Sequence, residues 1–494
     1  MAIETELKLH IAAGHLAVLR RHPFLRALSV APARTVKLYS VYYDTAGLKL
    51  RRHGMALRLR RIGARWVQTL KGGGQVSAGL HQRNEWEMPV AAEQLDFDAL
   101  ARSGGVLPRG VRRHLQPVFV TDFSRSIRLL DFEGARIELC LDSGEIRAGR
   151  SLFPISEVEL ELKSGEPLQL FRLALALLDL VPLRVEHTSK AEYGYRLFAA
   201  GNPAPVKGSF PVLHRGQHPA AALQAMMVAC LAQVQANVPG ALLELDEEYL
   251  HQVRVGLRRL RVVLAIARRM HDDAEATALR EQVARLCTDL GRAREWDVFV
   301  SQTLRTVAAQ LPDDSGIRAV LQASERKRKQ LHAATVDSLD SPDFQRMLLR
   351  FGAWLQSGQW QEPGIPLQRF ARRILQKQQR KVLAQGAALQ ANPAQLHALR
   401  VACKKLRYSV EMFASLFAEA GGKAYLAKLS AVQDDLGALH DIAIAEQLLD
   451  ELDGRQRRDT LELVRGWIGH EYAGRVAEFA RGWRRLARAD AFWD

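Results

Sequence analysis

The chain has 494 residues, long enough for two to four domains with substantial hydrophobic cores. Hydrophobic residues make up 48% of the chain and charged residues 25%, which is ordinary for a globular protein. The net charge of +16 and the isoelectric point near 9.9 are unusually basic, and they favour a polyanionic partner: nucleic acid, an anionic membrane or condensed phosphate.

Cysteine usage and hydropathy narrow the class further. The four cysteines, at 140, 230, 287 and 403, lie far apart and form no CxxC or Cys/His cluster. A disulfide framework or a zinc site is therefore not expected, and a reducing compartment is the default. Charged residues by the fourth position argue against a signal peptide, and no apolar run reaches the roughly 18 residues that span a bilayer. We expect a cytoplasmic protein without a membrane partner.

The first predicted element is a strand over residues 3–11, where charged and apolar side chains alternate. In a strand, Glu4, Glu6 and Lys8 project from one face, while Leu7 and Leu9 project from the other. One such strand is typical of any sheet with a face in water. The same alternation of charged and apolar residues returns at 56–61, 67–71, 83–87, 137–142 and 157–163.

Two further strands are predicted at 36–43 and 118–130, and amphipathic helices near 16–28 and 167–180. The total is about eight strands, mostly antiparallel because their connections are short. A sheet with one charged face in water explains each segment singly. A closed antiparallel barrel with its polar face inward explains why nearly pure acids and bases recur on most strands.

Such a lumen would combine two kinds of charge. Grouped carboxylates suit a hard divalent cation such as Mg²⁺ or Mn²⁺. Guanidinium and ammonium groups beside them suit phosphate oxygens. Together they are the side chains that metal-assisted phosphoryl hydrolysis requires.

Eight motifs, in order, resemble the CYTH family, the triphosphate tunnel metalloenzymes. They are Glu4-x-Glu6-x-Lys8, Tyr43-Asp44-Thr45, Leu57-Arg58-Leu59-Arg60, Thr69-Leu70-Lys71, Arg83-x-Glu85-x-Glu87, Asp142, Glu157/Glu159/Glu161 and Ser189-Lys190. The resemblance covers residues 1–200 and implies an eight-stranded antiparallel tunnel. It also implies divalent metal chemistry on a triphosphate: inorganic triphosphate, thiamine triphosphate, RNA 5′-triphosphate or ATP.

The resemblance further implies roles for individual residues. The implied metal ligands are Glu4, Glu6, Glu87, Asp142, Glu157, Glu159 and Glu161. The implied triphosphate-binding residues are Lys8, Arg58, Arg60, Lys71, Arg83, Arg128 and Lys190. Glu4, Glu6 and Lys71 are the implied catalytic residues. For any one of these residues the alternative is a structural ion pair inside the barrel.

The chain changes character near residue 205. The stretch 199–211 is rich in Gly and Pro, and we take 201–211 as a linker to a helical domain over 212–494. Residues 1–200 carry 29 basic and 21 acidic residues, so both parts have a net charge of +8. One polyanion-binding half therefore cannot account for the whole excess.

The helical part contains an internal duplication, about 212–350 and 360–494. The segment 251–261, HQVRVGLRRLR, resembles 397–407, HALRVACKKLR, at an offset of 146 residues. LGRARE at 290–295 answers LGALHD at 436–441 at the same offset, which is the signature of a repeat. Helical spacing puts one basic stripe on each copy. The stripes comprise His251, Arg254, Arg258 and Arg261 in the first copy, and His397, Arg400, Lys404 and Arg407 in the second.

A basic stripe on a helix is most often a solvated face, but its duplication at fixed offsets favours binding of a long, uniformly charged chain. Both copies resemble the CHAD domain, an all-helical module of two four-helix bundles, which implies binding of inorganic polyphosphate by the stripes together with Arg294 and His440. The second copy departs from the first, because His440 stands where Arg294 does and Ala443 where Asp297 does. It is therefore expected to bind more weakly or with more dependence on pH.

The whole chain thus resembles a CYTH–CHAD protein: an α+β multidomain chain with a β-tunnel and a helical pair of bundles. The expected function is a metal-dependent inorganic triphosphatase joined to a polyphosphate-binding domain. Few aromatic residues accompany the basic ones, so a nucleic-acid partner is not expected. Two alternatives stay open: a nucleotide-processing CYTH enzyme, such as an adenylate cyclase or organic triphosphatase, and a non-catalytic polyphosphate- or nucleic-acid-binding protein.

Overall fold

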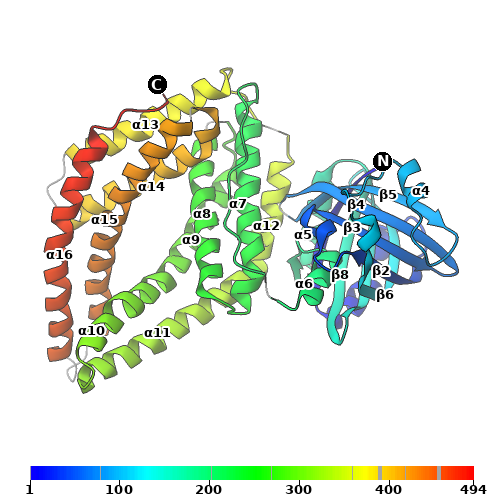
Figure 1. Ribbon diagram of the computed structural model, residues 1–494, viewed down its shortest axis with the longest axis horizontal. Helices are drawn as coiled ribbons and strands as arrows, with labels where there is room; N and C mark the ends of the chain where they lie inside the picture. Colours follow the sequence, from blue (N-terminus) through cyan, green and yellow to red (C-terminus); the bar gives the residue numbers. More distant parts are fainter. Residues whose placement is uncertain are drawn as a thin grey trace. The chain divides into compact units, whose positions relative to one another are not determined.

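The computed structural model describes residues 2–77, 79–201, 203–268, 270–358, 360–387, 392–417, 419–452 and 458–493 (Figure 1). The chain forms two compact units, each described by itself below. The first comprises Met1–Pro205 together with Asp340–Gly358, and the second comprises Val206–Leu339 together with Gln359–Asp494.

The first unit is a closed antiparallel barrel of eight strands. The strands are β1 (Ala2–Ile11), β2 (Arg34–Asp44), β3 (Met55–Ile62), β4 (Arg65–Ser77), β5 (Leu80–Val90), β6 (Gln116–Phe132), β7 (Ala135–Ala148) and β8 (Ser151–Ser164). They pair in the order β5-β4-β3-β2-β6-β7-β8-β1, and β1 pairs back with β5 to close the barrel. A ninth strand, β9 (Leu183–Val185), adds to β1. The predicted eight-stranded antiparallel tunnel is confirmed.

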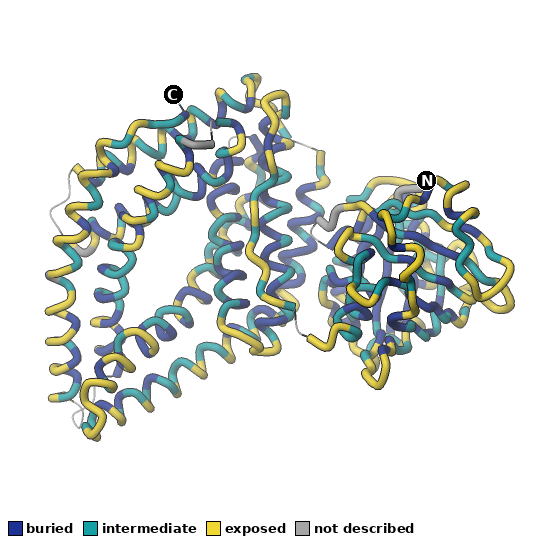
Figure 2. Tube along the Cα trace, viewed as in Figure 1, coloured by how far each residue is buried: buried dark blue, intermediate teal, exposed yellow. Residues whose placement is uncertain are grey.

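Strand register places the charged positions side by side in the lumen. Lys8 on β1 lies opposite Glu159 on β8, and Glu157 on β8 lies opposite Asp142 on β7. The outward-facing Leu7 and Leu9 of β1 are fully buried as well. Both faces of these strands are therefore buried, as in a barrel with a filled lumen and a covered outside (Figure 2).

Short helices connect and cover the strands. They are α1 (Ala13–Arg21), α2 (Pro23–Ala27), α3 (Lys49–Arg52), α4 (Phe97–Arg102), η1 (Arg112–His114), α5 (Pro167–Leu178) and α6 (Lys190–Ala199). The single helix predicted near 16–28 is two helices, because the chain at His22 is extended and Pro23 begins a new helix. The Phe24 N–H donates a hydrogen bond to Nδ1 of His22, which caps this second helix.

One helix from the second half of the sequence belongs to the first unit. Helix α12 (Pro342–Leu355) packs on α5 and β9. Gly352 lies so close to the ring of Phe171 that an added Cβ would come within 2.0 Å of it. The predicted helical domain of 212–494 is therefore corrected at 340–358, which packs with the barrel.

The second unit is helical and repeats itself. Its first copy has α7 (Pro219–Leu242), α8 (Glu247–Ala267), α9 (Ala274–Val298), the π-helical turn η2 (Phe299–Leu304), α10 (Arg305–Gln310) and α11 (Ser315–Asp340). Its second copy has α13 (Leu367–Ala387), α14 (Pro393–Phe413), η3 (Ala414–Leu416), α15 (Glu419–Glu451) and α16 (Arg458–Ala487). Helices α8 and α14 begin 146 residues apart, at 247 and 393, which matches the offset of the sequence motifs.

The two copies share a core. Trp296 of α9 and Val320 of α11 pack in one buried cluster with Leu449 of α15 and Leu461 of α16. Helix α7 is long and apolar enough to cross a membrane by length and composition alone, with a mean hydropathy of 1.3 over its most apolar window. More than half of that window is buried, as in a helix at the core of a bundle.

Candidate functional site: a charged tunnel and a basic helical cavity

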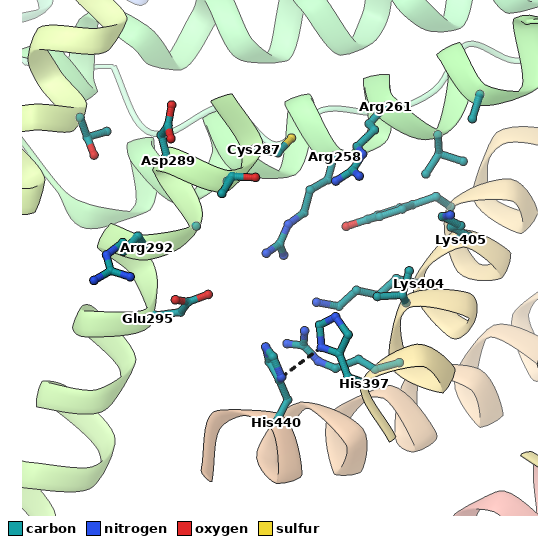
Figure 3. Close-up of a pocket in the computed structure, with 18 of the residues that line it drawn as sticks. Arg258, Arg261, Cys287, Asp289, Arg292, Glu295, His397, Lys404, Lys405 and His440 are labelled. Carbon is teal, nitrogen blue, oxygen red and sulfur yellow. Dashed lines mark hydrogen bonds between the residues drawn. The ribbon is translucent and has the colours of Figure 1, made fainter. Parts of the chain in front are cut away.

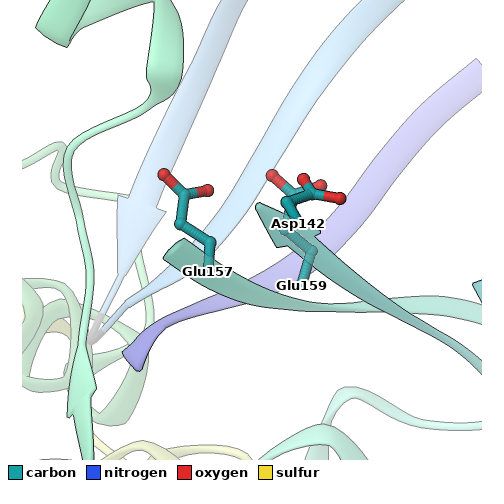
Figure 4. Close-up of side chains that lie close together, drawn as sticks. All are labelled: Asp142, Glu157 and Glu159. Carbon is teal, nitrogen blue, oxygen red and sulfur yellow. The ribbon is translucent and has the colours of Figure 1, made fainter. Parts of the chain in front are cut away.

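The lumen of the barrel holds three carboxylates within 4.8 Å of one another. They belong to Asp142 on β7 and to Glu157 and Glu159 on β8, and all three residues are buried. Figure 4 shows them projecting from the same side of the adjacent strands. Their contiguity follows from the register, because residues two apart on a strand share a face and residues opposite each other on neighbouring strands share it too.

Three cations surround this cluster. The Lys190 ammonium, at the start of α6, lies 2.5 Å from Glu157, 2.8 Å from Asp142 and 3.0 Å from Glu159. Lys8 pairs with Glu159 and lies 3.0 Å from Glu6. Arg125 donates from Nε and Nη2 to the two oxygens of Asp142, at 2.8 and 2.6 Å, and also contacts Glu159.

Opposing effects set the protonation of these acids. Burial would raise the pKa of Glu159, but Lys190, Lys8 and Arg125 together outweigh burial and hold that pKa well below its usual range. Burial would likewise raise the pKa of Glu6, but Lys8 and Lys71 lower it to about 2. For Glu4, burial and the neighbouring Glu6 carboxylate raise the pKa despite an ion pair with Lys71. Burial and the neighbouring Glu159 also raise the pKa of Glu157, so the lumen contains both firmly ionised carboxylates and others that accept a proton more readily.

The part of the lumen around Arg58 and Arg60 of β3 carries excess positive charge. Arg60 is partly buried, donates from Nε to Ser40 Oγ at 3.1 Å, and has no ion-pair partner among the described residues. Burial and the adjacent Arg58 lower its pKa to about 9. Arg58 itself lies 3.5 Å from Tyr42 Oη and 3.6 Å from Glu85. A partly desolvated guanidinium without a carboxylate partner destabilises the fold, and it suits a site that binds an anion.

A cavity of about 80 Å³ connects these groups. Its polar lining comprises Glu4, Glu6, Lys8, Tyr42, Arg58, Arg60, Lys71, Arg83, Arg125, Glu159, Ser189 and Lys190. The cavity is small and its lining carries charges of both signs, so it offers contacts to both an anion and a cation.

The helical unit contains a second, larger cavity of about 800 Å³ (Figure 3). Arg258 and Arg261 of α8 line it from the first copy, and His397, Arg400, Lys404 and Lys405 of α14 and His440 of α15 line it from the second. Further polar lining comes from Thr288, Asp289, Arg292 and Glu295 of α9, Thr335 and Ser338 of α11, and Tyr408 of α14. His397 and His440 share a hydrogen bond of 3.4 Å between their Nδ1 atoms, and Arg258 and Lys404 point into the space from opposite sides.

The cations of this cavity repel one another. Burial, with Arg258 and Arg400, lowers the pKa of Lys404 to about 6. Burial, with Arg258 and Arg294, lowers the pKa of Arg254 to about 9. Buried donor atoms of Arg254 and Arg400 have no hydrogen-bond partner among the described residues. Glu295 and Asp441 interact electrostatically with these cations, and Asp289 also lines the cavity.

Comparisons with known proteins agree with both geometries. The CYTH domain model matches residues 2–195, and the CHAD domain model matches residues 225–450. The chain contains a CYTH domain and a CHAD domain.

Individual relatives resemble each half. An inorganic triphosphatase of Haemophilus influenzae is 32% identical over 192 residues. The match covers 39% of this chain and 54% of that protein, so the chain spans about half the length of this curated relative. The crystal structure of a CHAD domain from the plant Ricinus communis is 29% identical with a TM-score of 0.53, covering 59% of this chain and 99% of that one.

Most of the residues that the sequence analysis assigned to the CYTH tunnel lie together. Glu4, Glu6, Lys8, Arg58, Arg60, Lys71, Arg83, Glu159 and Lys190 line the cavity. Asp142 and Glu157 complete the buried acidic cluster. Two lining residues, Arg125 and Tyr42, were missed. Strand alternation could have found Arg125, because it shares a face of β6 with Phe123, whose ring lies beneath the Arg125 and Lys190 cations.

Three assignments in the CYTH tunnel are corrected. Arg128 is three residues from Arg125 on the same strand and so faces the other side, where it bonds to Ser29 Oγ and the Arg20 carbonyl. Glu87 has the lumen-facing period but is exposed near the end of β5. Glu161 lies outside the acidic cluster and pairs with Lys163 at 2.6 Å.

Of the residues predicted to bind polyphosphate in the CHAD domain, some line the cavity and others do not. Arg258, Arg261, His397, Arg400, Lys404 and His440 line the cavity. His251, Arg254 and Arg294 are not in its lining but act electrostatically on one another and on it. Arg407 is corrected, because it pairs with Glu411 one turn along α14 at 3.4 Å. Lys405 and Arg292 are lining residues that the stripes did not include.

The acidic cluster fits a divalent metal in donor type. Hard carboxylate oxygens from Asp142, Glu157 and Glu159, and from Glu4 and Glu6 along the cavity, are the ligands that Mg²⁺ and Mn²⁺ prefer. The Lys190 ammonium contacts all three clustered carboxylates, so it and a metal ion would compete for the same oxygens. Lys190 is thus a cation built into the site that neutralises the acids.

Proposed function

We propose that the CYTH tunnel hydrolyses inorganic triphosphate to pyrophosphate and phosphate with Mg²⁺ or Mn²⁺. The observation that carries this proposal is one narrow cavity whose lining combines carboxylates with a guanidinium, Arg60, that has no acidic partner among the described residues. Glu159 belongs both to that lining and to the buried carboxylate cluster. The Haemophilus influenzae relative, which is called an inorganic triphosphatase, supports the same choice of substrate.

The basic side chains of the cavity would bind the phosphate groups, and the acidic side chains would bind the metal. Arg58, Arg60 and Arg83 would bind the outer phosphate oxygens, and Lys8 and Lys71 would bind oxygens near the acids. Glu4, Glu6, Asp142, Glu157 and Glu159 would hold the metal, which supplies Lewis-acid stabilisation of charge on the phosphate oxygens.

Hydrolysis needs one water molecule and one proton acceptor. The water oxygen bonds to the terminal phosphorus, the bridging P–O bond breaks, and the bridging oxygen leaves with pyrophosphate. A cavity-lining carboxylate that does not bind the metal would take the proton of the water.

Product analysis tests this proposal. The native chain is incubated with inorganic triphosphate, and separately with ATP, in Mg²⁺ and in Mn²⁺. We expect equal amounts of phosphate and pyrophosphate from inorganic triphosphate, and none when the metal is chelated. Release of cyclic AMP from ATP, or faster hydrolysis of ATP than of inorganic triphosphate, would instead favour a nucleotide-processing enzyme.

We also propose that the CHAD cavity binds inorganic polyphosphate. A chain of phosphate groups matches the charge of the cations that line the cavity, and it would relieve their mutual repulsion. Equilibrium binding of long-chain polyphosphate, with RNA of matched charge as competitor at fixed salt, tests the claim. Displacement of polyphosphate by RNA at equal charge would contradict it.

Polyphosphate binding should take up protons. The Lys404 pKa of about 6 in the free cavity means that Lys404 is mostly neutral above pH 6, whereas a bound anion favours its charged form. Affinity should therefore rise as the pH falls from about 9 to 6, by at most about tenfold per pH unit for each proton taken up. Titration of Lys404→Arg, whose side chain stays charged, should give a flatter profile, and equal slopes for both proteins would contradict the assignment.

A further inference from the structure

Helix α12 is bonded directly to the strand that extends β1. The Gln345 side chain is buried, and its Oε1 accepts a hydrogen bond from the Val185 N–H of β9 at 2.9 Å. Asp340, just before α12, pairs with Arg184 of β9 at 3.2 Å. On another side of the helix, Arg346 pairs with Asp179 after α5 at 2.8 Å. The position of β9 is therefore set by α12 as well as by β1.

Strand β9 leads straight to the lysine in the acidic cluster. Its backbone pairing with β1 continues at Glu186, whose N–H donates to the Lys8 carbonyl at 2.8 Å. The Glu186 carboxylate then accepts from the Thr188 N–H at 2.7 Å and from the Tyr193 hydroxyl at 2.8 Å. Ser189 caps α6, and Lys190 is the first residue of that helix. Residues 183–190 thus form one bonded segment that ends at the lysine.

The same helix directly follows, in the chain, a helix that lines the CHAD cavity. Leu331, Ala334, Thr335 and Ser338 of α11 line that cavity. Helix α11 ends at Asp340 and α12 begins at Pro342, so only Ser341 separates them, and Ser341 caps α12 through the Phe344 N–H. At its other end α12 stops at Leu355, and α13 begins at Leu367 after a non-helical stretch.

We propose that α12 couples occupancy of the CHAD cavity to the position of Lys190 in the CYTH tunnel. Gln345 is the positioning residue in this route, which runs from α11 through Ser341 to α12, β9 and residues 186–190. Because Lys190 neutralises the carboxylates that suit a metal, a shift of this segment changes how those carboxylates meet a metal and a triphosphate. The inference rests on both proposed functions, and linkage requires the coupling to act in both directions.

Hydrogen exchange of the full chain tests this route without relying on activity. Long-chain polyphosphate is added in metal-free buffer, and amide exchange is followed in peptides that cover residues 183–190. Binding should order α11 and α12, so we expect exchange there to slow by about fivefold, the lower end of ordinary coupling. A cavity variant, Arg258→Ala with Lys404→Ala, should show no slowing, and slowing in that variant would place the effect in the tunnel and overturn the proposal.

Two matched pairs of variants test the path itself. Insertion of Gly-Ser-Gly between Leu339 and Asp340, ahead of the residue that pairs with Arg184, should abolish the slowing, while the same insertion after Gly364, before α13, should preserve it. Gln345→Met removes the acceptor of the Val185 N–H at similar volume and should abolish the slowing, whereas Arg346→Met should keep it. The insertion leaves every side chain of α12 in place, so it decides the question if Gln345→Met fails to fold.

The outcomes separate the inference from the functions on which it rests. Polyphosphate bound to the native chain with no change at 183–190 would overturn the coupling alone, as would slowing that survives the insertion before Asp340. Failure of the native chain to bind polyphosphate would overturn the proposed role of the CHAD cavity, and the coupling with it.

Discussion

Replacing Arg60 by methionine is expected to lower kcat/KM for inorganic triphosphate by about 10²–10³-fold, the usual effect of removing one preorganised donor to developing charge. Arg60 has no ion-pair partner among the described residues, and desolvation with the neighbouring Arg58 lowers its pKa to about 9, so the free protein holds this cation at a cost. The melting temperature of Arg60→Met should therefore stay the same or rise while activity falls. Steady-state kinetics and thermal unfolding of the full chain measure both effects.

Arg128→Met is the matched control for Arg60→Met. Arg128 bonds to Ser29 and to the Arg20 carbonyl outside the cavity, so its loss should leave kcat/KM within about twofold of native. A large loss of activity in Arg128→Met, or full activity in Arg60→Met, would mean that the phosphate chain lies elsewhere.

The second large effect is expected in the CHAD cavity. Arg258→Ala with Arg400→Ala removes one guanidinium from each repeat and should weaken polyphosphate binding by about 10²–10³-fold, since a hydrogen bond to a charged group is worth roughly tenfold or more. The slope of log Kd against log salt concentration should also fall by the amount expected for two fewer cation–phosphate contacts. Titrations at several salt concentrations measure both quantities.

Arg407→Ala provides the comparison for this variant. Arg407 continues the same sequence stripe but pairs with Glu411, so its loss should change affinity by no more than about threefold. Equal losses for Arg407→Ala and for the double variant would indicate general charge attraction instead of a defined cavity.

The barrel could be predicted from the sequence because alternation has a period of two and fixes the face of every strand residue. The pattern of Glu4, Glu6 and Lys8, repeated on the other strands, required a place for many charges, and the closed lumen supplies it. Alternation fixes the face on which a side chain lies, but not how far along the barrel axis the residue lies. Glu87 and Glu161 therefore shared the period of the buried acids but lie away from them.

The ion pair between Arg407 and Glu411 could also have been predicted from the sequence. Arg407 has an acid four residues later, Glu411, whereas Arg261 at the equivalent position is followed by Ala265. An acid at that spacing is a neighbour on the helix surface and competes for the arginine. This local signal distinguishes the arginine that lines the cavity from the one that does not.

The position of α12 could not be predicted. Its amphipathic pattern required an apolar partner but did not identify which unit supplied it. The contact between Gly352 and Phe171 joins residues far apart in the sequence, and only the folded chain brings them together. The repeat offset, which located both basic stripes, carries no information about a segment that lies between the copies.

The central claim is that the carboxylates of the tunnel make this chain a metal-dependent triphosphatase. Its most direct test compares phosphate release from inorganic triphosphate by the native chain, by Glu4→Gln with Glu6→Gln, and by Glu161→Gln, each in Mg²⁺ and in Mn²⁺. We predict metal-dependent release by the native chain and by Glu161→Gln, whose carboxylate pairs with Lys163, and loss of at least about 10²-fold in the double variant. No release by the folded native chain, or equal release by all three proteins, would contradict the claim.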